Sequence, residues 1–305
     1  MTWNIAILMC TYNGGEFLKE QLDSFASQSY KDHHLFVYDD HSTDKTEELV
    51  AEYKKRNKAT WCRNQVQLGC CKNFLNSLVA TPDNFEFYSL ADQDDIWLEN
   101  KLSRAIEHLK NVPNGVPALY GSRSIITDNQ GNRTGLSPLF AKHPSFKNAL
   151  VQSIAGGNTM VFNKAARDII AKAVMDVDVF SHDWFIYQLI SGVGGKIYYD
   201  LEPEILYRQH GGNLTGSNNG FFARLSRAKS FLSGSFKGWN DRNLKALEKS
   251  VNLLTEENKK TFNIFTRARK RSMLFRLWEF FRSGIYRQTF VDNIALFVGA
   301  ILNKI

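Results

Sequence analysis

The chain has 305 residues, of which 43% are hydrophobic and 23% charged. This composition excludes a disordered protein, and the length is sufficient for one large domain or two smaller ones. The positive charge is concentrated at the C-terminal end: residues 211–305 contain 17 Lys and Arg against 6 Asp and Glu, whereas residues 1–210 contain 21 against 25. A basic end on a mildly acidic body predicts that the C-terminal part contacts an anionic surface.

The cysteines and the N-terminus indicate a cytoplasmic protein. Because the spacing of Cys10, Cys62, Cys70 and Cys71 matches no zinc signature, we expect free thiols in a reducing compartment. The chain enters a strand-like run at residue 5, so we expect no secretory signal. The longest late apolar run, 294–302, is too short to span a bilayer as a helix.

Strands and helices alternate in the first part of the chain. We predict strands where apolar residues run continuously, at 5–10, 35–38, 60–63 and 85–91. We predict helices where apolar residues recur every three or four positions, at 16–28, 46–55 and 73–79. This order predicts an α/β fold with a mostly parallel sheet flanked by helices.

The pattern is looser beyond residue 97. We predict further helices at 98–109, 164–174 and 182–190. We predict further strands at 118–122, 124–127, 155–162, 196–199 and 205–208. We place a domain boundary at residue 215, so that 1–215 form the α/β domain and 216–305 form a basic helical region.

Three polar clusters, at 11–15, 39–44 and 92–95, follow predicted strands. Ligands of parallel sheets lie at the edge where the strands end. In the third cluster, Asp92 and Asp94 project to the same side of an extended chain. They could hold a hard cation, Mg²⁺ or Mn²⁺, that leaves positions open for phosphate oxygens. The alternative is an acidic turn in which Asp95 caps a helix beginning near Ile96.

Other residues near the strand ends are candidates for binding a nucleotide: Thr11, Tyr12, Asn13, Asp40, Lys72 and Asn73. The turn at 11–13 could hold a planar base and ribose, or it could be only a strand-to-helix turn. Asp40 could accept a hydrogen bond from a pyrimidine ring NH, or make a local turn bond.

Later segments supply the remaining candidates. Asp183, at a predicted helix start, is the best candidate for a general base, and its structural alternative is a helix N-cap. Arg208, at a strand end, is suited to clamp a diphosphate with two parallel hydrogen bonds. His210 could bind the metal or a phosphate, or be structural.

Residues 3 to about 213 resemble a family 2 glycosyltransferase with the GT-A fold. The resemblance rests on the order and spacing of motifs at 11–14, 39–44, 91–97, 182–184 and 207–213. The Asp-Gln-Asp-Asp-Ile-Trp, His-Asp-Trp and Tyr-Arg-Gln-His motifs resemble the bacterial rhamnosyltransferase branch of cell-wall and capsular polysaccharide synthesis. The chain departs from the family at His41, where Gly is usual, and it lacks the Gln-x-x-Arg-Trp motif of processive synthases.

The resemblance implies metal-dependent, inverting transfer from a nucleotide sugar, with dTDP-L-rhamnose as donor and a lipid-linked glycan as acceptor. It implies that Asp40 contacts the base, and that Asp92 lies near the ribose and the metal. Asp94 would bind Mg²⁺ or Mn²⁺, which would neutralise the departing diphosphate. Asp183 would deprotonate the acceptor hydroxyl.

The basic end contains a segment typical of a helix in a membrane interface. Residues 259–287 contain nine basic residues and one acid. One side of this helix would carry Leu274, Leu277, Trp278, Phe281 and Ile285, and the other Arg276, Glu279, Ser283 and Arg287. We expect peripheral binding to the anionic inner face of a bacterial plasma membrane. The alternative is packing against the α/β domain or a partner subunit, and a homo-oligomer stays open.

Two other functions have weaker support. A nucleotidyltransferase should have a basic residue in the loop after the first strand, and residues 11–15 contain none. A nucleic-acid or anionic-polymer binder driven by the basic end should be basic throughout, whereas residues 1–210 are net acidic.

Overall fold

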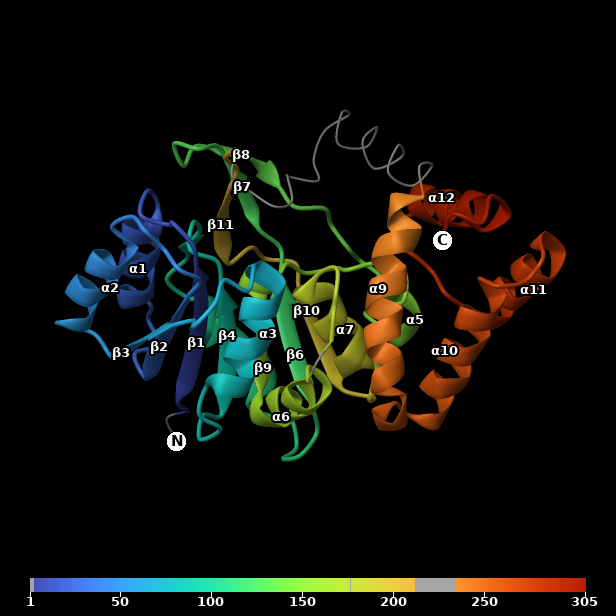
Figure 1. The fold of residues 1–305 in the computed structure, drawn as a ribbon, viewed down its shortest axis with the longest axis horizontal. Helices are drawn as coiled ribbons and strands as arrows, with labels where there is room; N and C mark the ends of the chain where they lie inside the picture. The colour runs from blue at the N-terminus through green and yellow to red at the C-terminus, as the bar shows by residue number, and fades with distance from the viewer. Residues whose placement is uncertain (1–2, 176, 212–233) are drawn as a thin grey trace.

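The computed structural model describes residues 3–175, 177–211 and 234–305. Its main element is a seven-stranded sheet in the order β10-β6-β9-β4-β1-β2-β3 (Figure 1). The strands are β1 Ile5–Thr11, β2 His33–Asp39, β3 Ala59–Arg63, β4 Phe87–Ala91, β6 Ala118–Ser122, β9 Val161–Asn163 and β10 Lys196–Asp200. Every pair is parallel except those of β9, which runs antiparallel to β4 and β6. The predicted mostly parallel α/β sheet is confirmed.

Helices cover both faces of this sheet (Figure 1). They are α1 Leu18–Ala26, α2 Thr46–Lys54, α3 Cys70–Ala80, α4 Lys101–Leu109, α5 Phe146–Ala149, α6 Lys164–Ala173 and α7 His182–Gly192. Alternate residues of β1 point to opposite faces: Ala6 and Leu8 join one apolar cluster, whereas Ile5, Ile7 and Met9 join the other. This two-sided burial is the reason that β1 reads as a continuous apolar run.

A second, smaller sheet corrects one expectation. It has the order β5-β11-β7-β8, with β5 Ile96–Trp97, β7 Ile125–Thr127, β8 Arg133–Leu136 and β11 Ile205–Arg208. Residues 96–97 are therefore a strand and not the start of a helix. Asp95 caps nothing, because its carboxylate accepts hydrogen bonds from Asn158 Nδ2 (2.5 Å) and from Arg208 N (3.3 Å).

The C-terminal region is helical, as expected, with α9 Ser235–Lys249, α10 Glu256–Ala268, α11 Met273–Ser283 and α12 Phe290–Ile301. Helix α9 lies beside α7, and α10 to α12 form the far end of the molecule (Figure 1). Phe236, Leu247 and Phe265 belong to the same apolar cluster as Leu8 of β1. The core is thus continuous from the sheet into these helices, while the boundary predicted at 215 lies outside the described residues.

We expect alanine substitution at two glycines to change the free energy of unfolding in opposite directions. A Cβ on Gly195, between α7 and β10, would lie 2.7 Å from Ile190 O and 2.9 Å from Pro117 O, and neither backbone atom can rotate away. We expect Gly195→Ala to lower the free energy of unfolding by about 1–3 kcal/mol through overpacking. The exposed Gly238 in α9 has no such neighbour within 4 Å among the described residues.

Gly238→Ala is the matched control. Because alanine favours a helix interior over glycine, we expect it to raise the free energy of unfolding by about 1 kcal/mol. Urea unfolding of both variants measures the two effects. A neutral Gly195→Ala would contradict the close packing of this turn.

Candidate active site

The candidate site lies where β1, β2 and β4 end. These strands are adjacent and parallel, so the segments after Thr11, Asp39 and Ala91 meet at one edge of the sheet. Helix α7 brings Asp183 to the same place, since the charge of Asp183 raises the pKa of Asp92. The structure therefore brings together acids that are far apart in the sequence.

The site concentrates negative charge. Burial, together with repulsion by Asp94 and then Asp183, raises the pKa of Asp92 to about 8. Burial also raises the pKa of Asp95 well above its usual range, with Asp92 and Asp94 as further causes. Carboxylates this close are destabilised when all are ionised, and a bound cation would relieve the repulsion.

The predicted metal ligands do not form a ready cluster. Among the described residues, no three His, Cys, Asp or Glu side chains converge as a metal site. His210 Nε2 instead lies 2.8 Å from Asp94 Oδ2, and the His210 ring packs on Phe17 with 4.8 Å between centroids. Asp92 and Asp94 still fit a hard divalent cation, because carboxylate oxygens are the ligands that such a cation prefers.

Hydrogen bonds hold the turn after β1 to the segments that follow β2 and β4. Thr11 Oγ1 donates to Asp39 Oδ1 (3.0 Å), and Asn13 Oδ1 accepts from Thr43 N (2.8 Å). Tyr12 N donates to Gln93 Oε1 (2.9 Å), which fixes the turn to the segment after β4. Of these three residues, Thr11 is buried, whereas Tyr12 and Asn13 are exposed. The aromatic ring of Tyr12 is the group in this turn that could stack on a planar base.

Asp40 and Asn73 hold a neighbouring loop. Asp40 accepts hydrogen bonds from Asn64 Nδ2 (2.9 Å) and from the backbone amides of Leu68 and Gly69 (2.7 Å each). Asn73 is buried, donates to Tyr38 O and accepts from Asn64 Nδ2. These internal partners give both side chains a structural role, and the base contact expected of Asp40 stays a prediction.

His41 occupies a backbone position that suits glycine. Its φ is +69°, in the left-handed region, where a residue with a Cβ is about 1–2 kcal/mol less stable than in the right-handed region. Asp39 stabilises the turn by accepting from Ser42 N (3.0 Å). The resemblance places Gly here, so the structure explains the family preference and keeps the turn despite the exception.

Arg208 binds other residues of the protein. Its Nε donates to Asp94 O (3.1 Å), its Nη1 to Asn129 O (2.9 Å), and its Nη2 pairs with Glu20 (2.6 Å). The guanidinium also lies 4.7 Å from the ring centre of Phe17. Because Arg208 is only 3% exposed, it offers little surface to the diphosphate that we expected it to clamp. Glu20 carried no signal in the sequence beyond its place in a helix.

Asp183 has the arrangement of a base with one anchored and one available oxygen. Its Oδ1 accepts from Trp184 N (2.6 Å) and from Ser181 Oγ. Its Oδ2 has no hydrogen-bond partner among the residues that the structure describes. Ser181 stands at the N-cap position, so Asp183 is inside the first turn of α7 and is not the cap.

Two further residues, His182 and Lys72, lie near these groups in the sequence or were predicted to contact the donor. His182 stacks on Phe74 with 4.3 Å between ring centroids, and burial lowers its pKa, which keeps the ring neutral beside Asp183. Lys72, predicted to contact the donor, is exposed and lines a separate cavity between α3 and α9.

Comparison with known proteins agrees with this geometry. The model of the family described as "Glycosyl transferase family 2" matches residues 6–170. This chain belongs to that family. The dTDP-rhamnosyl transferase RfbG of Shigella flexneri is 30% identical over 235 residues, which cover 72% of this chain and 77% of RfbG. The resemblance inferred from the motifs is confirmed.

Solved structures support the fold. The S. aureus TarS 1–349 structure with UDP-GlcNAc superposes with a TM-score of 0.56 at 14% identity, covering 93% of both chains. The mannosyltransferase PcManGT of Pyrobaculum calidifontis, solved with GDP-Man and Mn²⁺, gives 0.52 at 16% identity, covering 99% of this chain and 87% of that one. At these identities the likeness concerns the fold alone, and it confirms the expected GT-A type sheet.

The raised pKa of Asp92 makes stability depend on pH in the metal-free protein. Its folded pKa of about 8 exceeds its ordinary value of 3.8, so the native state holds more protons than the unfolded state between these values. In EDTA, the contribution of Asp92 to the free energy of unfolding is therefore full below about pH 4 and is lost as the pH rises to about 8.

Asp92→Asn should remove this part of the pH dependence, because asparagine does not titrate. Urea unfolding at several pH values in EDTA compares the variant with the parent protein. Identical pH profiles would mean that Asp92 is not buried against Asp94 and Asp183.

Proposed function

We propose that this member of family 2 is an inverting rhamnosyltransferase that transfers sugar from a nucleotide donor to a lipid-linked glycan. The observation that carries the proposal is the meeting of Asp92 and Asp94 with Asp183 beside the ends of the parallel strands. The first two acids can serve the departing diphosphate. Asp183, with Oδ2 available, can serve the incoming hydroxyl.

In this mechanism, Asp183 Oδ2 accepts the proton of the acceptor hydroxyl while that oxygen forms a bond to the anomeric carbon. The bond from this carbon to the diphosphate oxygen breaks on the opposite face, which inverts the configuration. Asp92 and Asp94 would hold Mg²⁺ or Mn²⁺, whose charge neutralises the leaving diphosphate. The Ser181 and Trp184 hydrogen bonds to Oδ1 fix the carboxylate so that Oδ2 faces the acceptor.

The identity of the donor rests on similarity. RfbG, whose name describes a dTDP-rhamnosyl transferase, is 30% identical to this chain. We therefore propose dTDP-L-rhamnose as the donor. A panel of nucleotide sugars with Mg²⁺ or Mn²⁺ tests this directly, since a glycosyltransferase releases the nucleoside diphosphate, whereas a nucleotidyltransferase joins or releases pyrophosphate.

Asp183→Asn should lower the rate of transfer by about 10²–10⁴-fold, the usual contribution of a general base. Donor binding should persist, because Asp183 acts on the acceptor. Product formation and donor titration are the two measurements. Asp168→Asn is the matched control, since Asp168 is a surface acid on α6 paired with Lys164 at 2.7 Å. Parent-like turnover by Asp183→Asn would remove Asp183 from the mechanism.

We further propose that α11 and α12 dock on an anionic membrane surface. Their amphipathicity is reversed relative to a helix packed on a globular protein. Arg276 and Glu279 of α11 face inward, where Arg276 Nη1 donates to Ala300 O (2.8 Å) and Glu279 pairs with Arg267 (2.6 Å). The apolar side chains of Leu274 and Phe281 are 74% exposed.

Helix α12 extends this apolar surface. Phe290 is 78% exposed, Val291 and Ile294 are also exposed, and Phe297 lies 6.0 Å from Phe281 between ring centroids. Only Leu277 and Ile285 of the predicted stripe pack partly against the core, so the alternative of full packing on the α/β domain does not apply. No helix in the described residues has the length and hydropathy needed to cross a bilayer.

Cations border the apolar surface. Arg282 lies 4.5 Å from the ring centre of Trp278, and Lys270 and Arg271 are exposed at the start of α11. Aromatic side chains beside basic ones suit the headgroup region of an anionic membrane, where each cation near the surface adds about 1 kcal/mol. The proposed lipid-linked acceptor would then be presented at the same surface.

The double variant Trp278→Ser/Phe281→Ser should bind vesicles of 70% phosphatidylcholine and 30% phosphatidylglycerol at least about tenfold more weakly, since it loses two exposed aromatic side chains that the membrane would bury. Co-sedimentation measures this. Leu253→Ser is the control, because Leu253 is an exposed apolar residue that follows the C-terminal end of α9. Unchanged sedimentation of the double variant would assign this surface to a partner subunit.

A further inference from the structure

The short 3₁₀-helix η1, Gly157–Thr159, contacts both halves of the candidate site. The strand that follows it, β9, pairs with β4, and β4 leads directly into the acid segment 92–95. Leu90 N donates to Met160 O (3.1 Å), and Ser89 Oγ donates to the same oxygen (3.2 Å). The end of η1 is therefore fixed to β4 just before the acids.

One contact of η1 is with the acid segment itself. Asn158 Nδ2 donates to Asp95 Oδ2 (2.5 Å), and both side chains are buried. A buried carboxylate keeps its place through such bonds, because a polar atom without a partner away from water is unfavourable. The turn that carries Asp92 and Asp94 is thus tied to η1 at its far end.

The other contact is with the start of α7. Gly157 lies against the imidazole of His182, where a Cβ would collide with Nε2 and would lie 3.3 Å from Cδ2. The same ring stacks on Phe74 of α3 with 4.3 Å between centroids. A residue without a Cβ is required for this close approach, and it leaves the ring held by both α3 and η1.

The atom of His182 that faces Gly157 makes no hydrogen bond. Nε2 is buried, and it has no partner within the part of the chain that the structure describes. Such an atom is unfavourable, so its presence in a native fold calls for an explanation. Packing alone places this end of the ring, and the next residue along the backbone is Asp183.

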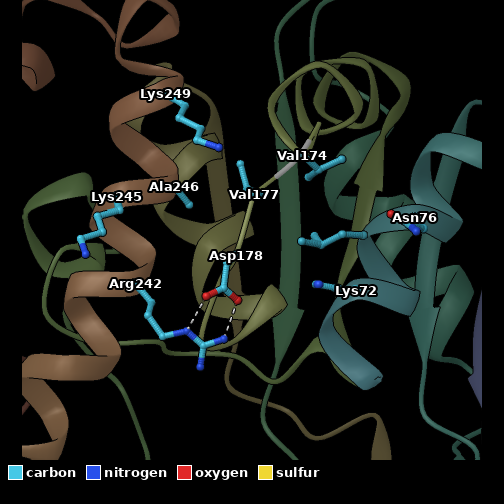
Figure 2. Close-up of a pocket in the computed structure, with 10 residues that line it drawn as sticks. Lys72, Asn76, Val174, Val177, Asp178, Arg242, Lys245, Ala246 and Lys249 are labelled. Carbon is cyan, nitrogen blue, oxygen red and sulfur yellow. Dashed lines mark hydrogen bonds and ion pairs between the residues drawn. The ribbon is translucent and has the colours of Figure 1, made fainter. Parts of the chain in front are cut away.

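Helix α9 holds the chain that leads into α7. Arg242 binds Asp178 with two hydrogen bonds, of 2.6 Å and 3.1 Å (Figure 2). Phe180 N donates to Asn243 Oδ1 (2.8 Å). This segment cannot move aside without breaking these bonds. A group that displaces the His182 ring must therefore shift η1 or the first turn of α7.

We propose that η1 sets the separation between the acids that hold the cation and the general base. Asn158 binds Asp95 on the side of the cation, and its neighbour Gly157 contacts His182, which precedes Asp183. The proposal rests on the proposed function, in which Asp183 is the base. In-line displacement needs the hydroxyl and the diphosphate held on opposite sides of one carbon, and this path fixes both sides. Because these contacts act through the acids, the residues of η1 are positioning residues.

Gly157→Ala tests the contact with α7. We expect it to lower kcat for transfer by about 10²-fold, the effect of misplacing a reacting group by about 1 Å. The donor KM should not change, because Asp183 acts on the acceptor. Gly238→Ala is the control, since it makes the same change where no described atom lies within 4 Å.

His182→Ala removes the ring with which the new methyl group would collide. His182→Ala and the double variant Gly157→Ala/His182→Ala should therefore have the same kcat and the same free energy of unfolding. A fault confined to η1 would instead lower both quantities equally with or without the ring. If Gly157→Ala does not fold, recovery of folding in the double variant supports the contact, and no recovery contradicts it.

Asn158→Ala tests the contact with the acids. We expect it to raise the Kd for Mn²⁺, titrated calorimetrically without donor, by about tenfold, as is usual when a residue that supports metal ligands is lost. Gly157→Ala should leave this Kd unchanged, which a general loss of stability would not. Asn84→Ala, at an exposed asparagine before β4, is the control.

Three results would overturn the inference: additive effects of Gly157→Ala and His182→Ala, a parent-like kcat of Gly157→Ala, or an unchanged Kd for Mn²⁺ in Asn158→Ala. The proposed function fails separately, if no nucleotide sugar is a substrate. In that case the comparison of unfolding free energies still decides whether Gly157 and His182 are coupled as described.

Discussion

The repulsion among Asp92, Asp94 and Asp183 is the constraint on which the rest of the site depends. Asp94 and Asp183 raise the pKa of Asp92, and acids that repel one another persist only where the scaffold holds them firmly. A sheet buried on both faces supplies that rigidity, because residues 5–9 of β1 are each fixed by apolar packing on one side or the other. The same arrangement leaves negative charge that a cation could neutralise, and the proposed mechanism uses such a cation for the departing diphosphate.

Three side chains of the protein support this site: Arg208, His210 and Lys101. Arg208 supports the Asp94 backbone and pairs with Glu20, and His210 bonds the Asp94 carboxylate. Lys101 is fully buried, where its ammonium donates to Ser89 Oγ (3.0 Å) and lies 3.5 Å from the ring centre of Trp97. Burial lowers the pKa of Lys101 to about 7, with nearby acids opposing the shift. These side chains stabilise the fold of the site through their hydrogen bonds.

The cations of the basic C-terminal region lie in two separate places. Cations of α9, such as Arg242 and Lys249, line a cavity between α3 and α9, whereas the cations near α11 border an exposed apolar surface. The inward ion pair between Arg267 and Glu279 allows α11 to turn its apolar side outward.

The sequence by itself determined the order of strands and helices, the glycosyltransferase family and the positions of the acids, because apolar periodicity and motif spacing are local properties. It also showed that His41 departs from the Gly usual in the family, and that α11 carries an apolar stripe. Tertiary structure alone decided which side chains remain available. Asp40 and Asn73 are bound by a loop at 64–69, Arg208 by Glu20, and Asp94 by His210. Such pairs join residues far apart in the chain, and a polar side chain that binds a ligand has the same chemistry as one that binds the protein.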